Sequence, residues 1–451
     1  MFKDATSPTN VPARLNDLLV QYRSPSALGP YERNPRTHSK RQIRQIKRSI
    51  ESFGFVNPVL IDANDRIIAG HGRVEAATLL GMEEIPTICV EGLSADQIRA
   101  YIIADNKLAA NAGWDNAILA IELQHLITLD CPDLDVAITG FEVAEIDAIL
   151  EEAKGSTVPE DLVPELESEA TTQFGDLWLL GKHKIICGNA LNDRTYKSLM
   201  SGRRVAMVFS DPPYNVKIDG HASGNGSNHH REFAMASGEM SEAEFVSFLT
   251  NAIELAARFS AADAIGYFCI DWRHIGDLLR AAMQSYDEFA NLCVWAKDNA
   301  GMGSFYRSQH ELVAVFRKGK GPHRNNVQLG KFGRHRTNLW WYPCAQTLSK
   351  QGDEGNLLAI HPTVKPVAMV ADAILDCTAR GEVVLDGFLG SGTTLMAAER
   401  VGRICFGIEI DPLYVDVAIR RWQNYTGEPA ILASTGKRFN EVSAPKEDAH
   451  G

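Results

Sequence analysis

Four consecutive residues, Asp211-Pro212-Pro213-Tyr214, combine groups that could hold the amino group of a planar ring. The carboxylate and the proline carbonyls accept hydrogen bonds, and neither proline has an N–H to donate. The tyrosine adds a flat face on which a base can stack. The alternative is a proline-rich turn that merely contains an acid and an aromatic residue, and these four residues alone do not decide between the two.

A glycine-rich turn nearer the C-terminus has the pattern of a nucleotide-binding loop. Gly387 to Thr394 follows the apolar run 383–386 and opens a helical run, and a second apolar run ends in Glu409. Glycines let the backbone approach a ligand closely, and an acid at the end of the next strand can bind ribose hydroxyls.

Three ligand classes compete for this turn. A phosphate-binding P-loop requires a lysine where Thr393 stands, and a dinucleotide motif requires three glycines where Gly390 and Gly392 supply two. Both readings leave the Asp-Pro-Pro-Tyr turn without a role. S-adenosylmethionine needs ribose, adenine and methionine contacts but no anion cradle, so the missing lysine does not count against it.

The elements around these turns predict an α/β fold. Strand-like and helix-like runs alternate through residues 174–430, which is typical of a Rossmann-like, doubly wound parallel sheet. The buried strand expected at 205–210 must leave the sheet at the two prolines. Open α/β sheets bind ligands at the carboxyl ends of their strands, so both turns are expected at one edge.

Residues 174–425 resemble the amino-methyltransferases of DNA. The resemblance rests on the Asp-Pro-Pro-Tyr turn, on Phe388-x-Gly390-x-Gly392 and on His361-Pro362-Thr363-x-Lys365-Pro366. The order of these motifs is similar to that of the β group of the family. The resemblance implies a methyltransferase dependent on S-adenosyl-L-methionine that methylates adenine N6 in double-stranded DNA after flipping the base out of the helix.

The resemblance also assigns roles to residues. Tyr214 would stack on the flipped base while Asp211 and the Pro212 carbonyl, in a turn completed by Pro213, accept hydrogen bonds from its amino group. Glu409 would bind the ribose of the cofactor, and Lys365 would lie near its methionine end. The expected cofactor-binding residues are Asp386, Phe388, Gly390, Gly392, Thr393, Glu409, Lys365 and Asn189. No metal site is suggested.

A basic stretch at 317–352 is the expected target-recognition element. It contains tryptophans and has no acid between Glu311 and Asp353, a composition that suits contacts to phosphates and to the DNA grooves. The expected DNA-binding residues are Arg317, Lys318, Arg324, Lys331, Arg334 and Arg336. Arg334 and Arg336 could read guanine or meet phosphates.

The N-terminal part, residues 31–152, resembles the smaller α+β ParB/sulfiredoxin-like domain, followed by a helical extension. The likeness rests on Asn34-Pro35, Ile68-Ala69-Gly70, Arg73 and Asp105-Asn106. Family members carry Gly-Glu-Arg-Arg where this chain has Gly-His-Gly-Arg at 70–73. That difference favours a DNA-contacting or regulatory domain over CTP binding or nuclease activity, and a scaffold that only packs is the alternative.

The remaining parts are expected to be a flexible arm at 1–30, a Pro- and Glu-rich linker at 153–173 and a tail at 431–451. The net charge is −12, the eight cysteines have no Cys-x-x-Cys pair, and no apolar run is long enough to span a bilayer. This composition predicts a cytoplasmic protein with reduced thiols and no membrane partner. The resemblance leaves two partners open: a second copy of the chain and a cognate restriction nuclease.

Several functions stay open at this point. The same acceptor turn serves adenine N6 and cytosine N4, although an Asp at its first position favours adenine. RNA or a protein glutamine could present a similar planar amino group, and the basic stretch and the ParB-like domain favour DNA over both. A non-catalytic ParB-like DNA-binding protein is the alternative of a different class, and it leaves the larger domain without a role.

Overall fold

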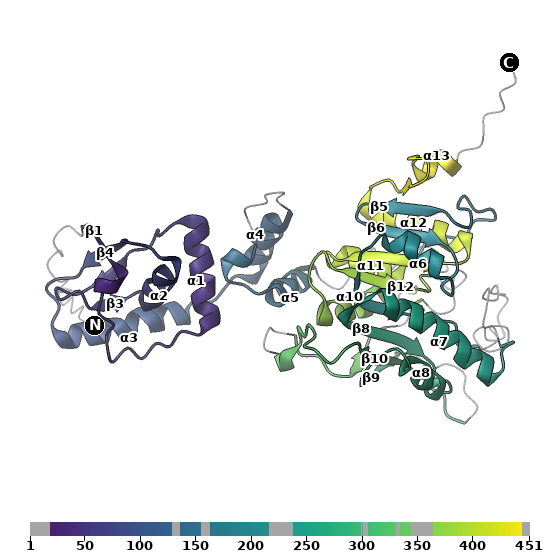
Figure 1. Cartoon of the computed structure of the whole chain (residues 1–451), viewed down its shortest axis with the longest axis horizontal. Helices are drawn as coiled ribbons and strands as arrows, with labels where there is room; N and C mark the ends of the chain where they lie inside the picture. The colour runs from purple at the N-terminus through teal and green to yellow at the C-terminus, as the bar shows by residue number, and fades with distance from the viewer. Residues whose placement is uncertain are drawn as a thin grey trace, which may run out of the picture. The chain divides into compact units, whose positions relative to one another are not determined.

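The computed structural model describes residues 19–128, 136–154, 163–215, 238–298, 300, 305–330, 334–343 and 364–443. The chain divides into two compact units, Met1–Lys154 and Gly155–Gly451, which are considered separately below (Figure 1). The division falls at the start of the linker expected over 153–173. Among the described helices, none combines the length and the apolar character needed to cross a membrane.

The first unit contains a small mixed sheet and several helices. Helix α1 begins after Ser39, whose hydroxyl accepts the N–H of Gln42, and ends at Gly54, where φ is 77°. The sheet order is β1-β4-β2-β3. The elements of this unit are β1 Val20–Arg23, α1 Lys40–Phe53, β2 Val59–Ile61, β3 Ile67–Ala69, α2 His71–Leu80, β4 Ile85–Cys89, α3 Ala95–Asn111, α4 Asn116–Thr128 and α5 Val143–Lys154.

The arm expected over residues 1–30 is corrected by strand β1. Val20–Arg23 pairs antiparallel with β4, and the hydroxyl of Thr87 donates to the carbonyl of Gln21 over 2.8 Å. The side chains of β1 are mostly exposed, so the strand lacks the alternation of buried and exposed residues that reveals a strand in a sequence. Its backbone hydrogen bonds to β4 hold it in the sheet.

The described part of the second unit has one ten-stranded sheet, ordered β11-β9-β10-β8-β7-β12-β13-β6-β5-β14. The five central strands from β8 to β6 are parallel, and the sheet continues on its two sides through β10 and β5, each antiparallel to its neighbours. The strands are β5 Leu177–Leu180, β6 His183–Cys187, β7 Val205–Ser210, β8 Ser260–Ile270, β9 Glu288–Ala296, β10 His310–Arg317, β11 Leu339–Trp341, β12 Val383–Asp386, β13 Ile404–Glu409 and β14 Ile431–Leu432.

Helices cover both faces of this sheet, which confirms the doubly wound α/β fold (Figure 1). Helices α10 (Val367–Cys377), α11 (Thr393–Arg400) and α12 (Pro412–Thr426) pack on one face, and α6 (Asp193–Met200), α7 (Glu242–Phe259) and α8 (Ile275–Ala282) pack on the other. The chain winds outward in opposite directions from β7 and from β12. These neighbouring strands form the topological switch point, where such sheets bind ligands.

The C-terminal residues that follow position 430 are not a bare tail, which corrects the expectation for 431–443. Strand β14 pairs antiparallel with β5, and α13 (Phe439–Ser443) places the ring of Phe439 5.3 Å from that of Trp178. The end of the expected linker is likewise held, because the hydroxyl of Thr172 donates to Asp416 of α12 over 2.5 Å. Both segments therefore belong to the second unit.

Candidate active site

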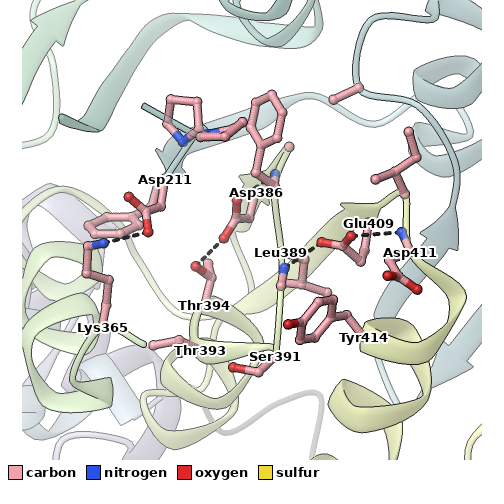
Figure 2. Close-up of a pocket in the computed structure, with 18 of the residues that line it drawn as sticks. Asp211, Lys365, Asp386, Leu389, Ser391, Thr393, Thr394, Glu409, Asp411 and Tyr414 are labelled. Atoms are coloured by element: carbon pink, nitrogen blue, oxygen red, sulfur yellow. Dashed lines mark hydrogen bonds and ion pairs between the residues drawn. The ribbon is translucent and has the colours of Figure 1, made fainter. Parts of the chain in front are cut away.

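A pocket opens at the carboxyl edge of the sheet, where β6, β7, β12 and β13 end. Figure 2 shows Asp386 between Asp211 and Glu409 in this pocket. The turn after β7 and the glycine-rich loop after β12 therefore reach the same cavity. Its lining residues are Gly188, Ala190, Phe209, Asp211, Pro212, Pro213, Tyr214, Val364, Lys365, Val370, Asp386, Gly387, Phe388, Leu389, Gly390, Ser391, Thr393, Thr394, Glu409, Ile410, Asp411 and Tyr414.

The turn after β7 is held rigidly on both sides. The Asp211 carboxylate accepts hydrogen bonds from Lys365 Nζ and from the Tyr214 hydroxyl, each over 2.5 Å. Next in the chain, Asn215 has φ of 56°, and its side chain binds the backbone of Gly238 and Met240. These hydrogen bonds connect residues on either side of segment 216–237, which lies outside the described residues.

Lys365 belongs to a partly buried row of alternating charges that the sequence did not reveal. Its Nζ lies 2.5 Å from Asp211 Oδ2 and 3.1 Å from Glu311 Oε2, and Glu311 Oε1 lies 2.5 Å from Lys297 Nζ. The Tyr214 hydroxyl is also 3.3 Å from Glu311 Oε2. Glu311 stands near the start of β10, which runs antiparallel to β8, and this topology brings it to the pocket edge. Residues 361–363 of the expected motif lie outside the described residues.

Burial and the neighbouring charges shift the pKa values of these residues. Burial raises the pKa of Asp211, although Lys365 opposes the rise. Burial alone would also raise the pKa of Glu311, but Lys365 and Lys297 lower it to about 2. For Lys365, burial favours the neutral amine, and the two neighbouring carboxylates outweigh it and raise its pKa above the ordinary value. Glu311 and Lys365 are therefore ionised at neutral pH.

The loop after β12 presents two further carboxylates. Glu409 Oε2 accepts the N–H of Gly390 over 2.7 Å, where φ is 53°, and Glu409 Oε1 accepts the N–H of Asp411. Asp386 accepts the hydroxyl of Thr394 over 2.6 Å and the N–H of Phe388. Burial raises the pKa of Asp386 to about 7 despite these hydrogen bonds, and burial also raises the pKa of Glu409.

Most of the predicted cofactor residues gather at the pocket, and two do not line it. Gly392 instead begins helix α11 with φ of 86°, and a Cβ there would lie 2.9 Å from Ala418 Cβ, so glycine is needed for helix packing. The side-chain oxygen of Asn189 accepts the N–H of Leu191 within a turn. Asp411 and Tyr414, which the sequence did not suggest, do line the pocket. The position of Asp411 as the N-cap of α12, directly after a strand end, was the available signal.

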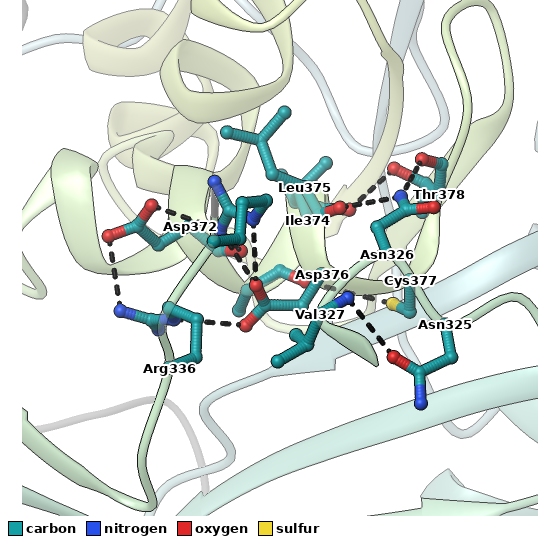
Figure 3. A network of polar contacts seen from close by, with 12 residues as sticks. Asn325, Asn326, Val327, Arg336, Asp372, Ile374, Leu375, Asp376, Cys377 and Thr378 are labelled. Carbon is teal, nitrogen blue, oxygen red and sulfur yellow. Dashed lines mark hydrogen bonds and ion pairs between the residues drawn. The ribbon is translucent and has the colours of Figure 1, made fainter. Parts of the chain in front are cut away.

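The basic stretch contains a buried ion-pair network rather than an open surface at Arg334 and Arg336. Arg334 is 7% exposed, and its Nη2 lies 2.7 Å from Asp376 Oδ1. Figure 3 shows Arg336 in contact with Asp372 and Asp376 of α10. The two ion pairs each measure 3.2 Å. The predicted DNA contacts of these two arginines are therefore corrected, because both guanidinium groups hold the stretch against α10.

The other predicted DNA contacts also lie away from the pocket or are already engaged. Arg317 is the last residue of β10 and Lys318 follows it, at the opposite edge of the sheet from Asp211. Arg317 pairs with Glu288 over 2.8 Å, and Lys318 Nζ donates to the carbonyls of Ala257 and Ser260. Arg324 pairs with Glu382 just before β12, again at the opposite edge. Lys331 lies outside the described residues.

Comparison with known families divides the chain in the same way as the fold. Residues 205–420 match the model of a DNA methylase family, residues 16–106 match the ParB N-terminal domain, and residues 117–174 match the helix-turn-helix domain of ParB-methyltransferases. The last match extends across the division between the two compact units at 154 and 155.

Individual proteins resemble the two halves separately. The ParB-like nuclease domain-containing protein YnaK of Escherichia coli is 50% identical over 80 residues, which are 18% of this chain and 92% of YnaK. The type II methyltransferase M2.DpnII of Streptococcus pneumoniae is 26% identical over 254 residues, which are 53% of this chain and 90% of that protein. The solved PvuII DNA methyltransferase, described as cytosine-N4-specific, has a TM-score of 0.40 and 17% identity over 55% of this chain and 90% of its own. Residues 205–420 are thus an N6/N4 DNA methylase domain, and a ParB-like domain precedes them in the chain.

Proposed function

We propose that this DNA methyltransferase transfers the methyl group of S-adenosyl-L-methionine to the N6 amino group of adenine in duplex DNA. The observation that supports it most directly is the shared pocket. An acceptor turn with an aromatic ring and a glycine loop with a ribose-binding acid open into one cavity from neighbouring strands. An acid as the first residue of the acceptor turn favours adenine in the resembled family, and cytosine N4 is the alternative.

The charge of the pocket fits this cofactor. Among the lining residues that the structure describes, Asp211, Asp386, Glu409 and Asp411 are acids, and the one lysine or arginine is Lys365, which is paired with Asp211. Such a pocket suits a cationic ligand and disfavours a nucleotide phosphate. When bound, the cofactor supplies a methyl group on a positively charged sulfur. Glu409 would accept hydrogen bonds from its ribose, and Asp386 would face its positive charge.

The residues of the turn explain how the amino group is made reactive. Asp211 and the Pro212 carbonyl would accept its two hydrogen bonds, which draws the nitrogen lone pair out of conjugation with the ring. Tyr214 would stack on the flipped base and offset about 1–3 kcal/mol of the cost of unstacking it. The residues thus act by positioning and by electrostatics, which can supply most of the rate enhancement in such a site.

The direct test is methyl transfer from labelled S-adenosyl-L-methionine to unmethylated duplex DNA, followed by separation of the nucleosides. Label in N6-methyladenine is the expected result. Label in N4-methylcytosine would overturn the choice of base and keep the mechanism. Cofactor binding without transfer to any DNA would instead direct the search to RNA or to protein amides.

Binding of the cofactor should strengthen as the pH rises through about 7. Asp386 has a pKa of about 7 in the free protein, so its attractive negative charge appears over this range. We expect affinity to rise roughly three- to tenfold between pH 6 and pH 8, measured by titration calorimetry. S-adenosylhomocysteine is the matched control, because it keeps the amino and carboxyl groups but lacks the positive sulfur. Equal pH dependence for both ligands, or an unchanged slope in Asp386→Asn, would contradict this role of Asp386.

The DNA-facing surface is better sought in four exposed aromatic residues than in the arginines and lysines of the basic stretch. These rim aromatics are Trp272, Phe305, Tyr306 and Trp341, with exposed fractions of 50%, 86%, 82% and 69%. Trp272 follows β8, Phe305 and Tyr306 precede β10, and Trp341 ends β11, so strand directions bring all four to the pocket edge. Arg273 lies over the ring of Trp272, and aromatic and cationic side chains together suit DNA.

Tyr306→Ala should weaken DNA binding by about 1–3 kcal/mol, the range for losing one stacking contact. Fluorescence anisotropy with a labelled duplex measures this loss. Tyr425→Ala is the control, because Tyr425 stands near the end of α12 at the opposite edge of the sheet. Unchanged affinity in Tyr306→Ala would remove this residue from the proposed interface.

Three expectations about organisation stay predictions. These are DNA contact or regulation by the ParB-like unit, a homodimer, and a cognate restriction nuclease. The affinity of the first unit for DNA, compared with that of the whole chain at several salt concentrations, would address the first of them.

A further inference from the structure

Glu311 is a largely buried acid beside the pocket to which neither the resemblance nor the proposed mechanism gives a role. Its side chain is 12% exposed, and it contacts Lys365, Lys297 and the Tyr214 hydroxyl. Removing a buried carboxylate from water is costly unless its partners compensate, and here two lysines do so. Because burying this carboxylate beside Asp211 costs free energy, we expect a role of Glu311 in the reaction at the turn.

The geometry shows what Glu311 changes for Asp211. Lys365 Nζ is shared between Asp211 and Glu311, so its positive charge is divided between two carboxylates. The Tyr214 hydroxyl has two acceptors within reach, Asp211 Oδ1 at 2.5 Å and Glu311 Oε2 at 3.3 Å. If an incoming amino group donates to Asp211 Oδ1, the hydroxyl can turn to Glu311 and keep a hydrogen bond. Without Glu311, both donors would fall on Asp211 alone.

We propose that Glu311 is a positioning residue for methyl transfer: it shares Lys365 and receives the Tyr214 hydroxyl, and thereby leaves the Asp211 carboxylate available as an acceptor for the substrate amino group. This inference rests on the proposed function. Lys297 completes the arrangement by balancing the charge of Glu311, so two acids and two lysines form a neutral set.

Two variants should shift the pKa of Asp211 in opposite directions. The charged and titratable groups around Asp211 are Tyr214 from its own turn, Cys269 on β8, Lys297 after β9, Glu311 on β10, Lys365 before α10 and Asp386 on β12. Glu311→Gln removes a negative neighbour and leaves Lys365 to Asp211, so the pKa of Asp211 falls. Lys297→Met leaves Glu311 without its balancing charge, so the pKa of Asp211 rises.

The experiment measures kcat/KM for duplex DNA against pH in the full chain, at saturating S-adenosyl-L-methionine. Glu311→Gln should lower the plateau roughly ten- to hundredfold, with unchanged cofactor affinity, and move the acid limb of the profile to lower pH. Lys297→Met should move the limb to higher pH. Glu288→Gln is the matched control, an ion-paired acid at the opposite edge of the sheet, and its profile should stay that of the unmodified chain.

Opposite displacements of the limb would support the inference, because damage to the fold has no reason to produce them. If one variant does not fold, the displacement of the acid limb in the other variant still tests the inference. Unchanged limbs, or displacements in the same direction, would overturn the role of Glu311 while leaving the methyltransferase intact. Failure of the proposed function is recognised separately, because the unmodified chain would then transfer no methyl group to DNA.

Discussion

Asp211→Asn is expected to lower kcat for DNA methylation by about a hundred- to thousandfold while S-adenosyl-L-methionine still binds. The asparagine has the same shape, but it has one oxygen where the carboxylate has two. Lys365 lies 2.5 Å from Asp211 Oδ2, so an amide oxygen turned toward the lysine presents an N–H₂ to the substrate amino group. If the amide is turned the other way, its N–H₂ group faces the ammonium of Lys365, and two hydrogen-bond donors then oppose each other. Losing one preorganised electrostatic contact has an effect of this size in other enzymes.

Single-turnover methylation of a duplex, together with calorimetric titration of the cofactor, separates chemistry from binding. Asp263→Asn is a suitable control, since Asp263 is an exposed acid near the start of β8, at the opposite edge of the sheet. Activity within about threefold of the unmodified chain in Asp211→Asn would remove the carboxylate from the mechanism.

Arg334→Met should destabilise the second unit by about 3–5 kcal/mol, the range for breaking a buried ion pair by removing one partner. The guanidinium of Arg334 donates to Asp376 and also to the carbonyl of Asp372, and both belong to α10. Methionine fills a similar volume but leaves Asp376 buried with Arg336 as its remaining charged partner. Urea-induced unfolding followed by tryptophan fluorescence measures the change.

The same variant also tests whether the basic stretch reads DNA. At a temperature where the protein stays folded, the affinity for duplex DNA and its dependence on salt should be unchanged, because Arg334 contacts α10 in this structure. Lys320→Met, at an exposed lysine nearby, should leave the stability unchanged. Unchanged stability with weakened DNA binding in Arg334→Met would restore the original assignment.

The elements with strong local signals could be predicted from the sequence. Ser39 and Gly54 delimit α1, Ser241 caps α7, and the apolar runs that end at Asp211 and Glu409 form β7 and β13. In each case the residues that define the element are neighbours in the chain. The pairing of the two motifs at one pocket also followed from a general property of parallel sheets.

The contacts that were missed depend on residues far apart in the chain. Nothing near Glu311 or Lys365 in the sequence shows that they meet at Asp211, because the antiparallel return of β10 is a property of the whole sheet. The same holds for Arg334, whose acidic partners lie on α10, beyond the end of the basic stretch. A cluster of positive charges in a sequence therefore does not reveal whether its partners are phosphates or carboxylates of the same fold.

The pairing of β14 with β5 joins the last strand described in the second unit to the first one described there. The N–H of Ala433, just after β14, donates to the carbonyl of Leu177, the first residue of β5, over 2.8 Å. The end of β14 therefore lies beside the start of β5. A short new peptide could connect them there while the chain was opened in a different loop, and the hydrogen-bonded order of the strands would be unchanged. The order of the acceptor turn and the cofactor loop along a gene can then vary by circular permutation, with the same pocket assembled each time.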